Sequence, residues 1–278
     1  MRRTAVMPTE EWGFADSCLL HPPDGGIWSL SGRRVCALED RGVRLNKFIA
    51  DSGYCSRREA DRLIAEGRVW IDGRTGGLGD RVEPGMEVLV DGKALTGRCE
   101  KVYIALNKPV GIVCTADPRE PMNVVDYLGY PERVFPIGRL DKDSQGLLLL
   151  TSDGEIVNRI LRAAGRHEKE YEVVIDRPVT PSFVEKMSAG VPILDTVTLP
   201  CRVRRTGERS FNIVLVQGLN RQIRRMCEAL GCRVVSLRRV RIMNIRLGGL
   251  KPGQWRMLTA AELSELMRRL EGENKGRE

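Results

Sequence analysis

A polar loop between two apolar segments constrains the fold of this chain more than any other feature of its sequence. Apolar runs at 134–137 and 147–151 flank a polar stretch that begins after Gly138 and ends at Gly146. This pattern predicts two strands joined by a loop at the edge of a rigid sheet, a placement that suits a functional site. The charged residues that would project from that edge are Arg139, Asp141, Lys142 and Asp143.

Strand and helix signals alternate through the rest of the chain from 101 onward. Strands are predicted at 102–106, 112–115, 171–175, 199–205, 210–217 and from about 232 to 247. Helices are predicted at 123–128, 153–163, 181–189 and 220–230, and a last one follows the capping box of Thr259 and Glu262. Because the strand pairs lack regular helical crossovers, we expect an α+β domain with a mixed, largely antiparallel sheet and peripheral helices.

Residues 41–95 have the pattern of a small separate domain. One short helix is predicted before Gly53, and a second opens with a capping box formed by Ser56 and Glu59 and closes at Gly67. Short strands are predicted at 69–71 and 87–90. Basic side chains stand on the outer face of the second helix. They are Arg57, Arg58 and Arg62, and the alternative is a helical hairpin on which these arginines are incidental.

The positive charge is concentrated in one window. The chain has 45 Lys and Arg against 37 Asp and Glu, a net charge of +8. Residues 201–246 hold 12 Arg, no Lys and two acids, Glu208 and Glu228, a balance of +10. An arginine-dominated window in a folded region indicates a phosphate-binding surface. The alternative is a solvated face of arginine-rich strands.

Composition excludes several classes of protein. The longest aliphatic run is four residues, Leu147 to Leu150, whereas a spanning helix needs about 20 apolar residues, so we expect no membrane span. The first 30 residues contain acids, among them Glu10, Glu11 and Asp16, and no sustained apolar core, so they do not read as a secretory signal peptide. The eight cysteines contain no CxxC pair and only two histidines accompany them. We therefore expect reduced thiols in a cytoplasmic protein and no metal site.

Two stretches read as connections rather than folded units. Residues 1–40 lack sustained periodicity and contain the turn signal PPDGG at 22–26, so we expect a poorly ordered extension. Residues 96–100 are expected to form a linker, which leaves 41–95 and 101–278 as the two folded domains.

Six segments carry a resemblance to known families. RLNKFIADSGYCSRREADRLIAEGRVWIDG, beginning at Arg44, resembles the S4 RNA-binding domain. LNKPVG at 106–111, GRLDKDSQGLLLLTSDG at 138–154, KEYEV at 169–173 and GLNRQIRRM at 218–226 together resemble the RsuA family of RNA pseudouridine synthases. The segment at 241–259 looks closest to the RluF-type branch, which acts on large-subunit ribosomal RNA.

The resemblance implies a role for each matching residue. It places the catalytic aspartate at Asp141, the tyrosine that lies against the target base at Tyr171, the arginine that pairs with the aspartate at Arg224, and the arginine of base extrusion at Arg139. It implies RNA contacts for Arg57, Arg58, Arg62, Lys108, Arg221 and Arg225. Two positions depart from the common pattern: Ser144 stands where Thr is usual, and Leu219 stands where many relatives carry a basic residue.

The implied reaction converts a specific uridine of ribosomal RNA to pseudouridine and needs no cofactor. The implied partner is ribosomal RNA, with small-subunit or transfer RNA as alternative substrates, and the expected state is a monomer. Two other classes remain at this point. One is a non-catalytic RNA-binding ribosome assembly factor, and the other is a metal-dependent nuclease that uses Asp141, Asp143 and Asp153.

Overall fold

The computed structural model describes residues 42–95, 100–117, 119–161 and 167–272. The expected extension at 1–40, most of the expected linker at 96–100 and the last residues of the helix predicted to reach 163 lie outside this part of the chain. In the part that is described, no helix is long and apolar enough to cross a membrane.

The small N-terminal unit folds as two helices and a small sheet. Its elements are β1 (Val43–Arg44), α1 (Leu45–Asp51), α2 (Arg57–Ala65), β2 (Val69–Ile71), β3 (Arg74–Thr75), β4 (Arg81–Val82), β5 (Val88–Val90) and β6 (Lys93–Ala94). Four strands form a sheet in the order β3-β2-β5-β6, and β1 pairs with β4. Leu45, Ile49 and Leu63 lie in a core shared by the helices and the sheet.

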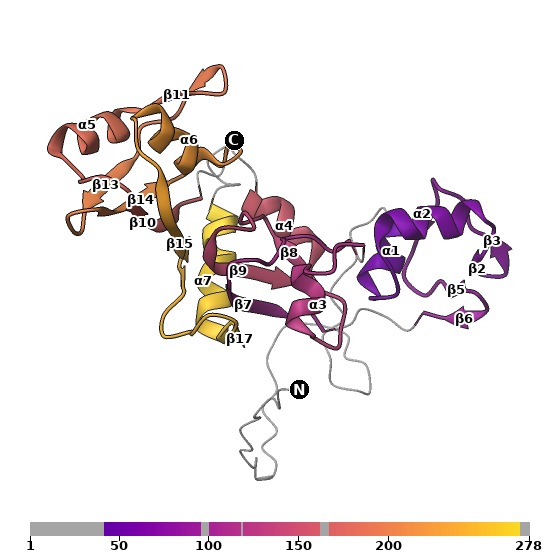
Figure 1. Cartoon of the computed structure of the whole chain (residues 1–278). Coiled ribbons are helices and arrows are strands. Elements are labelled where there is room, and N and C mark those ends of the chain that lie inside the picture. The colour runs from indigo at the N-terminus through magenta and orange to yellow at the C-terminus, as the bar shows by residue number, and fades with distance from the viewer. Residues whose placement is uncertain (1–41, 96–99, 118, 162–166, 273–278) are drawn as a thin grey trace, which may run out of the picture. The chain divides into compact units, whose positions relative to one another are not determined.

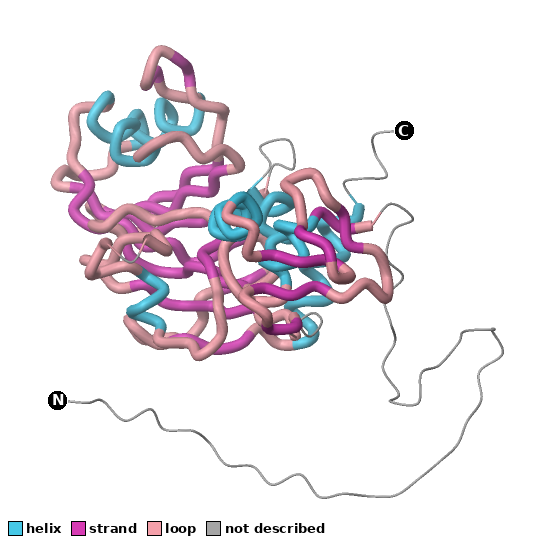
Figure 2. Tube along the Cα trace, turned by 90° about the vertical axis from the view of Figure 1, so that its right-hand side faces the viewer, coloured by secondary structure: helices cyan, strands magenta, loops and turns pink. Residues whose placement is uncertain are grey.

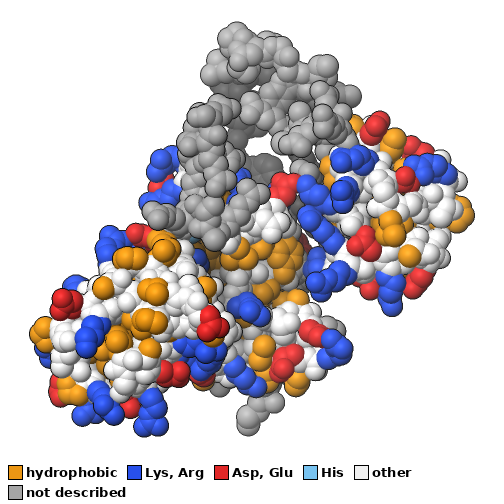
Figure 3. All heavy atoms as spheres, turned by 90° about the horizontal axis from the view of Figure 1, so that it is seen from above, with side chains coloured by type: hydrophobic (Ala, Val, Ile, Leu, Met, Phe, Trp, Pro, Cys, Tyr) orange, Lys and Arg blue, Asp and Glu red, His pale blue; other side chains and the backbone are white. Residues whose placement is uncertain are grey.

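The structure confirms the Ser56 half of the predicted capping box, whereas the Glu59 side chain accepts from Arg62 instead. The Ser56 hydroxyl accepts a hydrogen bond from the backbone N–H of Glu59 at 3.1 Å, which satisfies a donor that α2 would otherwise leave unpaired. Arg57, Arg58 and Arg62 are all exposed on α2. In the space-filling view, Lys and Arg side chains of this unit gather along one edge (Figure 3).

The rest of the described chain is built on a nine-stranded sheet (Figures 1 and 2). Its strands are β7 (Tyr103–Lys108), β8 (Phe135–Ile137), β9 (Gln145–Thr151), β10 (Lys169–Ile175), β13 (Arg202–Arg205), β14 (Ser210–Leu215), β15 (Val234–Ile242), β16 (Ile245–Arg246) and β17 (Trp255–Met257). The helices are α3 (Val124–Leu128), α4 (Gly154–Leu161), α5 (Pro181–Ala189), α6 (Gln222–Ala229) and α7 (Ala260–Gly272). The hairpin of β11 (Pro192–Ile193) and β12 (Thr196–Val197) stands apart from the sheet.

Strand order runs β13-β14-β10-β15-β9-β7-β17, with β16 beside β15 and β8 beside β9. Every pairing is antiparallel except that of β15 with β9. The expected mixed, largely antiparallel sheet with peripheral helices is therefore confirmed. Figure 2 shows the helices at the periphery of the strands.

The leucine run of β9 is buried on both faces of the sheet. Leu147 and Leu149 pack in the cluster that includes Leu266 of α7, whereas Leu148 and Leu150 pack in the cluster that includes Val124 of α3. Alternate side chains of a strand point to opposite faces, so a continuous apolar run is what a strand covered on both sides requires. This burial makes β9 a rigid support for the loop that precedes it.

A second apolar cluster supports the other half of the sheet. It joins β10, β14 and β15 to α5 and α6, with Phe211 and Met226 fully buried. Thr180 caps α5 through its hydroxyl, which accepts the N–H of Phe183, and Pro181 takes the first helical position as predicted. The two halves of the sheet thus have separate cores and meet at the pairing of β15 with β9.

Only two residue pairs, Arg238 with Gln145 and Arg239 with Gly146, form the β15–β9 junction. Gly146 adopts a φ of +107°, in the left-handed region that favours glycine, and its Cα lies against the Arg239 backbone. The glycine that closes the polar loop therefore also allows the two halves to approach.

Two details of the predicted strands differ from the structure. Residues 112–115 do not form a strand; only Val113 makes an isolated bridge, to Asn123. Asn123 instead caps α3 by accepting the N–H groups of Val125 and Asp126, and its backbone bond to Glu120 folds this segment into turns. The edge strand β17 was not predicted, because its three residues follow a Gly-rich turn and give too short a pattern.

Candidate active site

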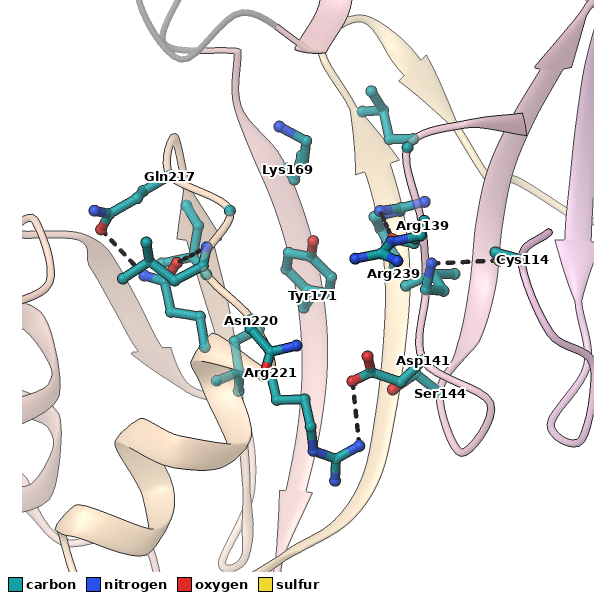
Figure 4. Close-up of a pocket in the computed structure, with 18 of the residues that line it drawn as sticks. Cys114, Arg139, Asp141, Ser144, Lys169, Tyr171, Gln217, Asn220, Arg221 and Arg239 are labelled. Carbon is teal, nitrogen blue, oxygen red and sulfur yellow. Dashed lines mark hydrogen bonds and ion pairs between the residues drawn. The ribbon is translucent and has the colours of Figure 1, made fainter. Parts of the chain in front are cut away.

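A cavity of about 920 Å³ lies at the junction of the two halves of the sheet (Figure 4). The loop that precedes β9 forms one wall, and the segment from 215 to 224, which leads into α6, forms the opposite wall. Tyr171 of β10 lies between them (Figure 4). The cavity brings together four residues that the sequence analysis placed in catalysis: Asp141, Arg139, Tyr171 and Arg224.

Backbone hydrogen bonds and one buried leucine fix the loop that carries Asp141. The Ser144 N–H donates to the Asp141 carbonyl at 3.1 Å, and the Gly111 N–H donates to the Lys142 carbonyl at 2.7 Å. Leu140 is buried, so Arg139 and Asp141 on either side of it both turn to the cavity. The Asp141 carboxylate remains partly exposed, as a group that must meet a substrate requires.

Two guanidinium groups flank Asp141. Arg221 Nη1 lies 3.6 Å from Asp141 Oδ2, and Arg224 Nε lies 4.0 Å from the same oxygen. Both guanidinium groups therefore lie within ion-pair distance of the carboxylate. The expected pairing of Arg224 with Asp141 is thus present at the limit of an ion pair, and Arg221, which we expected only to bind RNA, lies nearer.

The buried Arg224 also holds the loop itself. Its Nη2 donates to the Asp143 carbonyl at 3.0 Å and to the Ser144 hydroxyl at 3.1 Å, and it lies 3.3 Å from the Asp143 carboxylate. Arg224 is 8% exposed, whereas Arg221, just before α6 in a left-handed conformation with φ +50°, is open to solvent. The hydrogen bonds that Arg221 donates to the Asp143 carboxylate raise the pKa of Arg221. Arg224 therefore holds the loop from its buried side, and Arg221 contacts the same loop from the solvent side.

A β-bulge determines what stands beside Tyr171. The register of β10 on β15 shifts between Glu170, which pairs with Arg241, and Tyr171, which pairs with Arg239. One residue of β15, Val240, is therefore left without a partner, and Arg239 rather than Val240 comes to lie opposite Tyr171. Tyr171 packs partly against both apolar clusters, which leaves one side of its ring to line the cavity.

Basic side chains line the cavity wall beyond Tyr171. Arg139 is exposed, Lys169 is half-buried and Arg239 is 3% exposed. Arg239 Nε donates to the Leu147 carbonyl at 2.7 Å, and its Nη1 donates weakly to the Arg139 carbonyl at 3.4 Å. Figure 4 shows these three residues on the side of Tyr171 away from Arg221.

One predicted RNA-binding residue is corrected by the structure. Lys108 is fully buried, and its ammonium group donates to the Pro109 carbonyl at 2.9 Å. Burial lowers the pKa of Lys108. Its position next to Pro109 suggested a turn facing the RNA, but β7 continues through Lys108 and carries its side chain inside the protein.

The other predicted residues occupy the protein surface or the cavity rim. Arg225 is half-buried outside the cavity lining, with Nε and Nη2 donating to Asn220, and Arg221 is exposed at the cavity rim. Asp153 lies apart from the cavity, where it accepts hydrogen bonds from Tyr103 and the Glu155 N–H. Within the described ranges, no group of three or more His, Cys, Asp and Glu side chains is placed to hold a metal ion.

Sequence reasoning missed the contributions of Ser144, Lys169 and Arg239. Strand periodicity could have identified Lys169, which is two residues before Tyr171 and so shares its face. Ser144 appeared only as a departure from the family pattern, yet its hydroxyl bonds Arg224. Arg239 had no signal of its own, because its place opposite Tyr171 depends on the bulge.

The arrangement suits chemistry on a flipped-out nucleobase. A carboxylate held by guanidinium groups can attack or assist the departure of a leaving group. An aromatic ring beside it offers a stacking surface for a base, and arginines at the rim can contact phosphates.

Comparisons with known proteins agree with this geometry. The family model of RNA pseudouridylate synthase matches residues 102–229, and that of the S4 domain matches residues 43–94. The dual-specificity RNA pseudouridine synthase RluF of Escherichia coli K12 is 55% identical over 84% of this chain and 81% of its own length. The ribosomal large subunit pseudouridine synthase B of Bacillus subtilis is 34% identical over 80% of this chain and 95% of its own.

Among solved structures, one described as a pseudouridylate synthase superposes with a TM-score of 0.59 at 30% identity, covering 81% of this chain and all of the other. The sequence similarity extends through both the S4 match and the synthase match. This chain belongs to the RsuA family of RNA pseudouridine synthases.

Proposed function

We propose that this protein converts a specific uridine of large-subunit ribosomal RNA to pseudouridine and that Asp141 begins the reaction. The observation that carries the proposal is the Asp141 carboxylate in a cavity, with Arg221 and Arg224 at 3.6 and 4.0 Å and Tyr171 lining the same space. The reaction breaks the N1–C1′ bond and forms a C5–C1′ bond, while the proton on C5 is lost and N1 gains one. Atoms and charge balance without a co-reactant.

Asp141 acts as an ionised carboxylate in this proposal. Covalent addition to the ribose or the uracil and assisted elimination at the ribose both begin from that state. Arg221 and Arg224 lie 3.6 and 4.0 Å from the carboxylate and hold it by ion pairs. Arg224, which bonds the loop at Asp143 and Ser144, also fixes the direction of the carboxylate.

Tyr171 receives the extruded target base, and Arg139 takes its place in the RNA stack. Extruding a stacked nucleotide costs a few kcal/mol, so the protein must supply contacts that the duplex loses. The Tyr171 ring lines the cavity and offers a face for the extruded uracil, and Tyr171 assists proton removal from C5 in this proposal. Arg139 is exposed at the rim, two residues before Asp141, and enters the vacated stack.

The N-terminal unit serves as a second grip on RNA. Residues 41–95 form the S4 domain and 101–278 the catalytic domain in this proposal, with 96–100 as the linker between them. Arg57, Arg58 and Arg62 bind phosphates through the S4 domain, while Arg221 and Arg225 do so near the cavity. The exposure of the three α2 arginines supports this division of labour.

Ribosomal RNA of the large subunit is the substrate that the relatives support best. The name of the B. subtilis relative specifies the large ribosomal subunit, and that of the E. coli relative specifies dual specificity. Other substrates are to be tested as well, first transfer RNA and then small-subunit RNA, which the sequence left open as alternatives. We infer a monomer that acts in the cytoplasm in ribosome biogenesis.

The test is to incubate the full-length protein with unmodified large-subunit ribosomal RNA in the presence of EDTA and to map pseudouridine by carbodiimide treatment and reverse-transcription stops. One new stop is the expected result and names the target. A stop on transfer RNA or small-subunit RNA alone would show that this RNA is the substrate and not large-subunit ribosomal RNA. The absence of a new stop on all three RNAs would contradict the proposed activity.

A further inference from the structure

The charges around the cavity are unevenly balanced. On the side of Arg221 and Arg224, two carboxylates, Asp141 and Asp143, compensate two guanidinium groups. On the opposite side of Tyr171, the described residues supply three cations and no acid that pairs with them. These cations are Arg139, Lys169 and Arg239.

The acids of β10 do not reach this side of the cavity. Glu168 and Glu170 pair with Arg241, and Glu172 pairs with Arg238. Lys169 and Tyr171, at the alternate positions of the strand, line the cavity instead. Strand alternation thus separates the acids from the cations and leaves the cavity wall positive.

Arg239 is the buried member of this cluster and is incompletely satisfied. Nε bonds the Leu147 carbonyl, Nη1 lies 3.4 Å from the Arg139 carbonyl, and Nη2 has no hydrogen-bond partner among the residues that the structure describes. A buried guanidinium needs compensating charge, because its desolvation is costly. A purely structural role, in which Arg239 holds the Leu147 carbonyl, would need the Nε bond alone. That role does not explain why Nη2 is buried without a hydrogen bond among the described residues.

Lys169 shows the same lack of a counter-ion. The only hydrogen bond that its ammonium group makes to described residues is to the His167 carbonyl, at 3.2 Å. Burial, and then the charge of Arg239, lowers the pKa of Lys169. An anion bound between the two side chains would remove both penalties.

We propose that Lys169 and Arg239, beside Arg139, form a subsite for one backbone phosphate adjacent to the target uridine. A neutral uracil cannot compensate this cluster, whereas a phosphodiester carries the missing negative charge and accepts several hydrogen bonds. The subsite lies across Tyr171 from Arg221, so it anchors the backbone while the base meets the ring and Asp141. This inference rests on the proposed function and specifies how its substrate is held.

The test uses synthetic RNA fragments that contain the uridine mapped for the wild-type protein. In each fragment one phosphate near that uridine is replaced by an uncharged methylphosphonate, and single-turnover kcat/KM for pseudouridine formation is measured. The proteins are wild type, Lys169→Gln, Arg239→Gln and the control Lys186→Gln, which removes an exposed lysine from α5.

We expect one neutral linkage adjacent to the target to lower wild-type kcat/KM by tenfold or more. On the unmodified fragment, Lys169→Gln should lower kcat/KM by a similar factor. Introducing the same neutral linkage should then lower the kcat/KM of Lys169→Gln by less than a further threefold. Lys186→Gln should behave as wild type. We expect the same result for Arg239→Gln if its circular dichroism spectrum matches that of wild type. If the spectrum differs, the test rests on Lys169→Gln alone.

Equal sensitivity of wild type and Lys169→Gln to that linkage would overturn the subsite. Insensitivity of the wild type to every neutral linkage, together with a slow Lys169→Gln, would assign the cluster to the base and also overturn it. Failure of the proposed function is distinguishable, because the wild type would then make no pseudouridine in the all-phosphate fragment.

Discussion

Gly146 and Arg239 meet backbone to backbone where the two halves of the sheet join. A Cβ placed on Gly146 would lie 2.6 Å from the Arg239 amide nitrogen and closer still to its carbonyl oxygen. The loop that carries Asp141 ends at this glycine, and the Arg239 side chain lines the cavity. One close contact therefore sets both the junction of the sheet and the distance across the active site.

Gly146→Ala should lower the free energy of unfolding by about 3 kcal/mol, because it adds a backbone clash to left-handed strain. Gly111→Ala is the matched control: Gly111 has a φ of +94° but no atom within 4 Å of an added Cβ, so it should cost only about 1 kcal/mol. Urea denaturation measures both. Equal losses in the two variants would show that the close approach carries no energetic weight.

Arg224→Gln should lower the free energy of unfolding by about 3 kcal/mol, since it removes a buried guanidinium that bonds Asp143 and Ser144. Arg221→Gln should cost less than about 1 kcal/mol, because Arg221 is exposed. Both should lower kcat, as each lies within 4.0 Å of Asp141. Denaturation and single-turnover rates measured on both variants separate the two effects. A more destabilising Arg221→Gln would contradict the roles assigned here.

Glu262 links the start of α7 to acid stability. A hydrogen bond from Arg256, supported by the Thr259 N–H, lowers the pKa of Glu262 below its ordinary 4.5. Its stabilisation is therefore present above the unfolded pKa and is lost as the pH falls through the folded pKa. Glu262→Gln should be about 1 kcal/mol less stable than wild type at pH 7, and the difference should shrink toward pH 3. A difference that is constant with pH would contradict this linkage.

Replacing Arg57, Arg58 and Arg62 together by Gln should weaken binding to ribosomal RNA and reduce the salt dependence of binding by a slope of about 2 to 3. The rate of isomerisation at saturating protein should stay near that of wild type. Arg268→Gln/Arg269→Gln, which removes two surface arginines from α7, is the control for loss of positive charge and should leave binding unchanged. Filter binding at several salt concentrations measures the slope. An unchanged slope in the triple variant would remove the S4 domain from RNA binding.

Local signals predicted much of this fold because its elements carry their own caps and periods. The N-cap at Ser56, the capping box at Thr259 and the Thr180-Pro181 start of α5 satisfy backbone donors within a few residues and so can be seen in sequence. The leucine run of β9 likewise shows that a strand is covered on both faces.

Long-range features could not be predicted in this way. The parallel pairing of β15 with β9 joins residues more than 90 positions apart, and the bulge that brings Arg239 opposite Tyr171 depends on the register of two distant strands. The place of Lys108 beside Pro109 suggested a turn at the surface, whereas β7 carries its side chain inside. Motifs therefore located the catalytic loop, and only the structure revealed the buried cation beside it.

The most direct test of the central claim compares wild type with Asp141→Asn on unmodified large-subunit ribosomal RNA without added metal. Asparagine keeps the size of the side chain and removes its charge, so pseudouridine formation should be abolished. RNA affinity should fall by less than tenfold, because phosphate contacts dominate binding. A folded Asp141→Asn protein that still makes pseudouridine at the wild-type site, or one that no longer binds the RNA, would contradict the account.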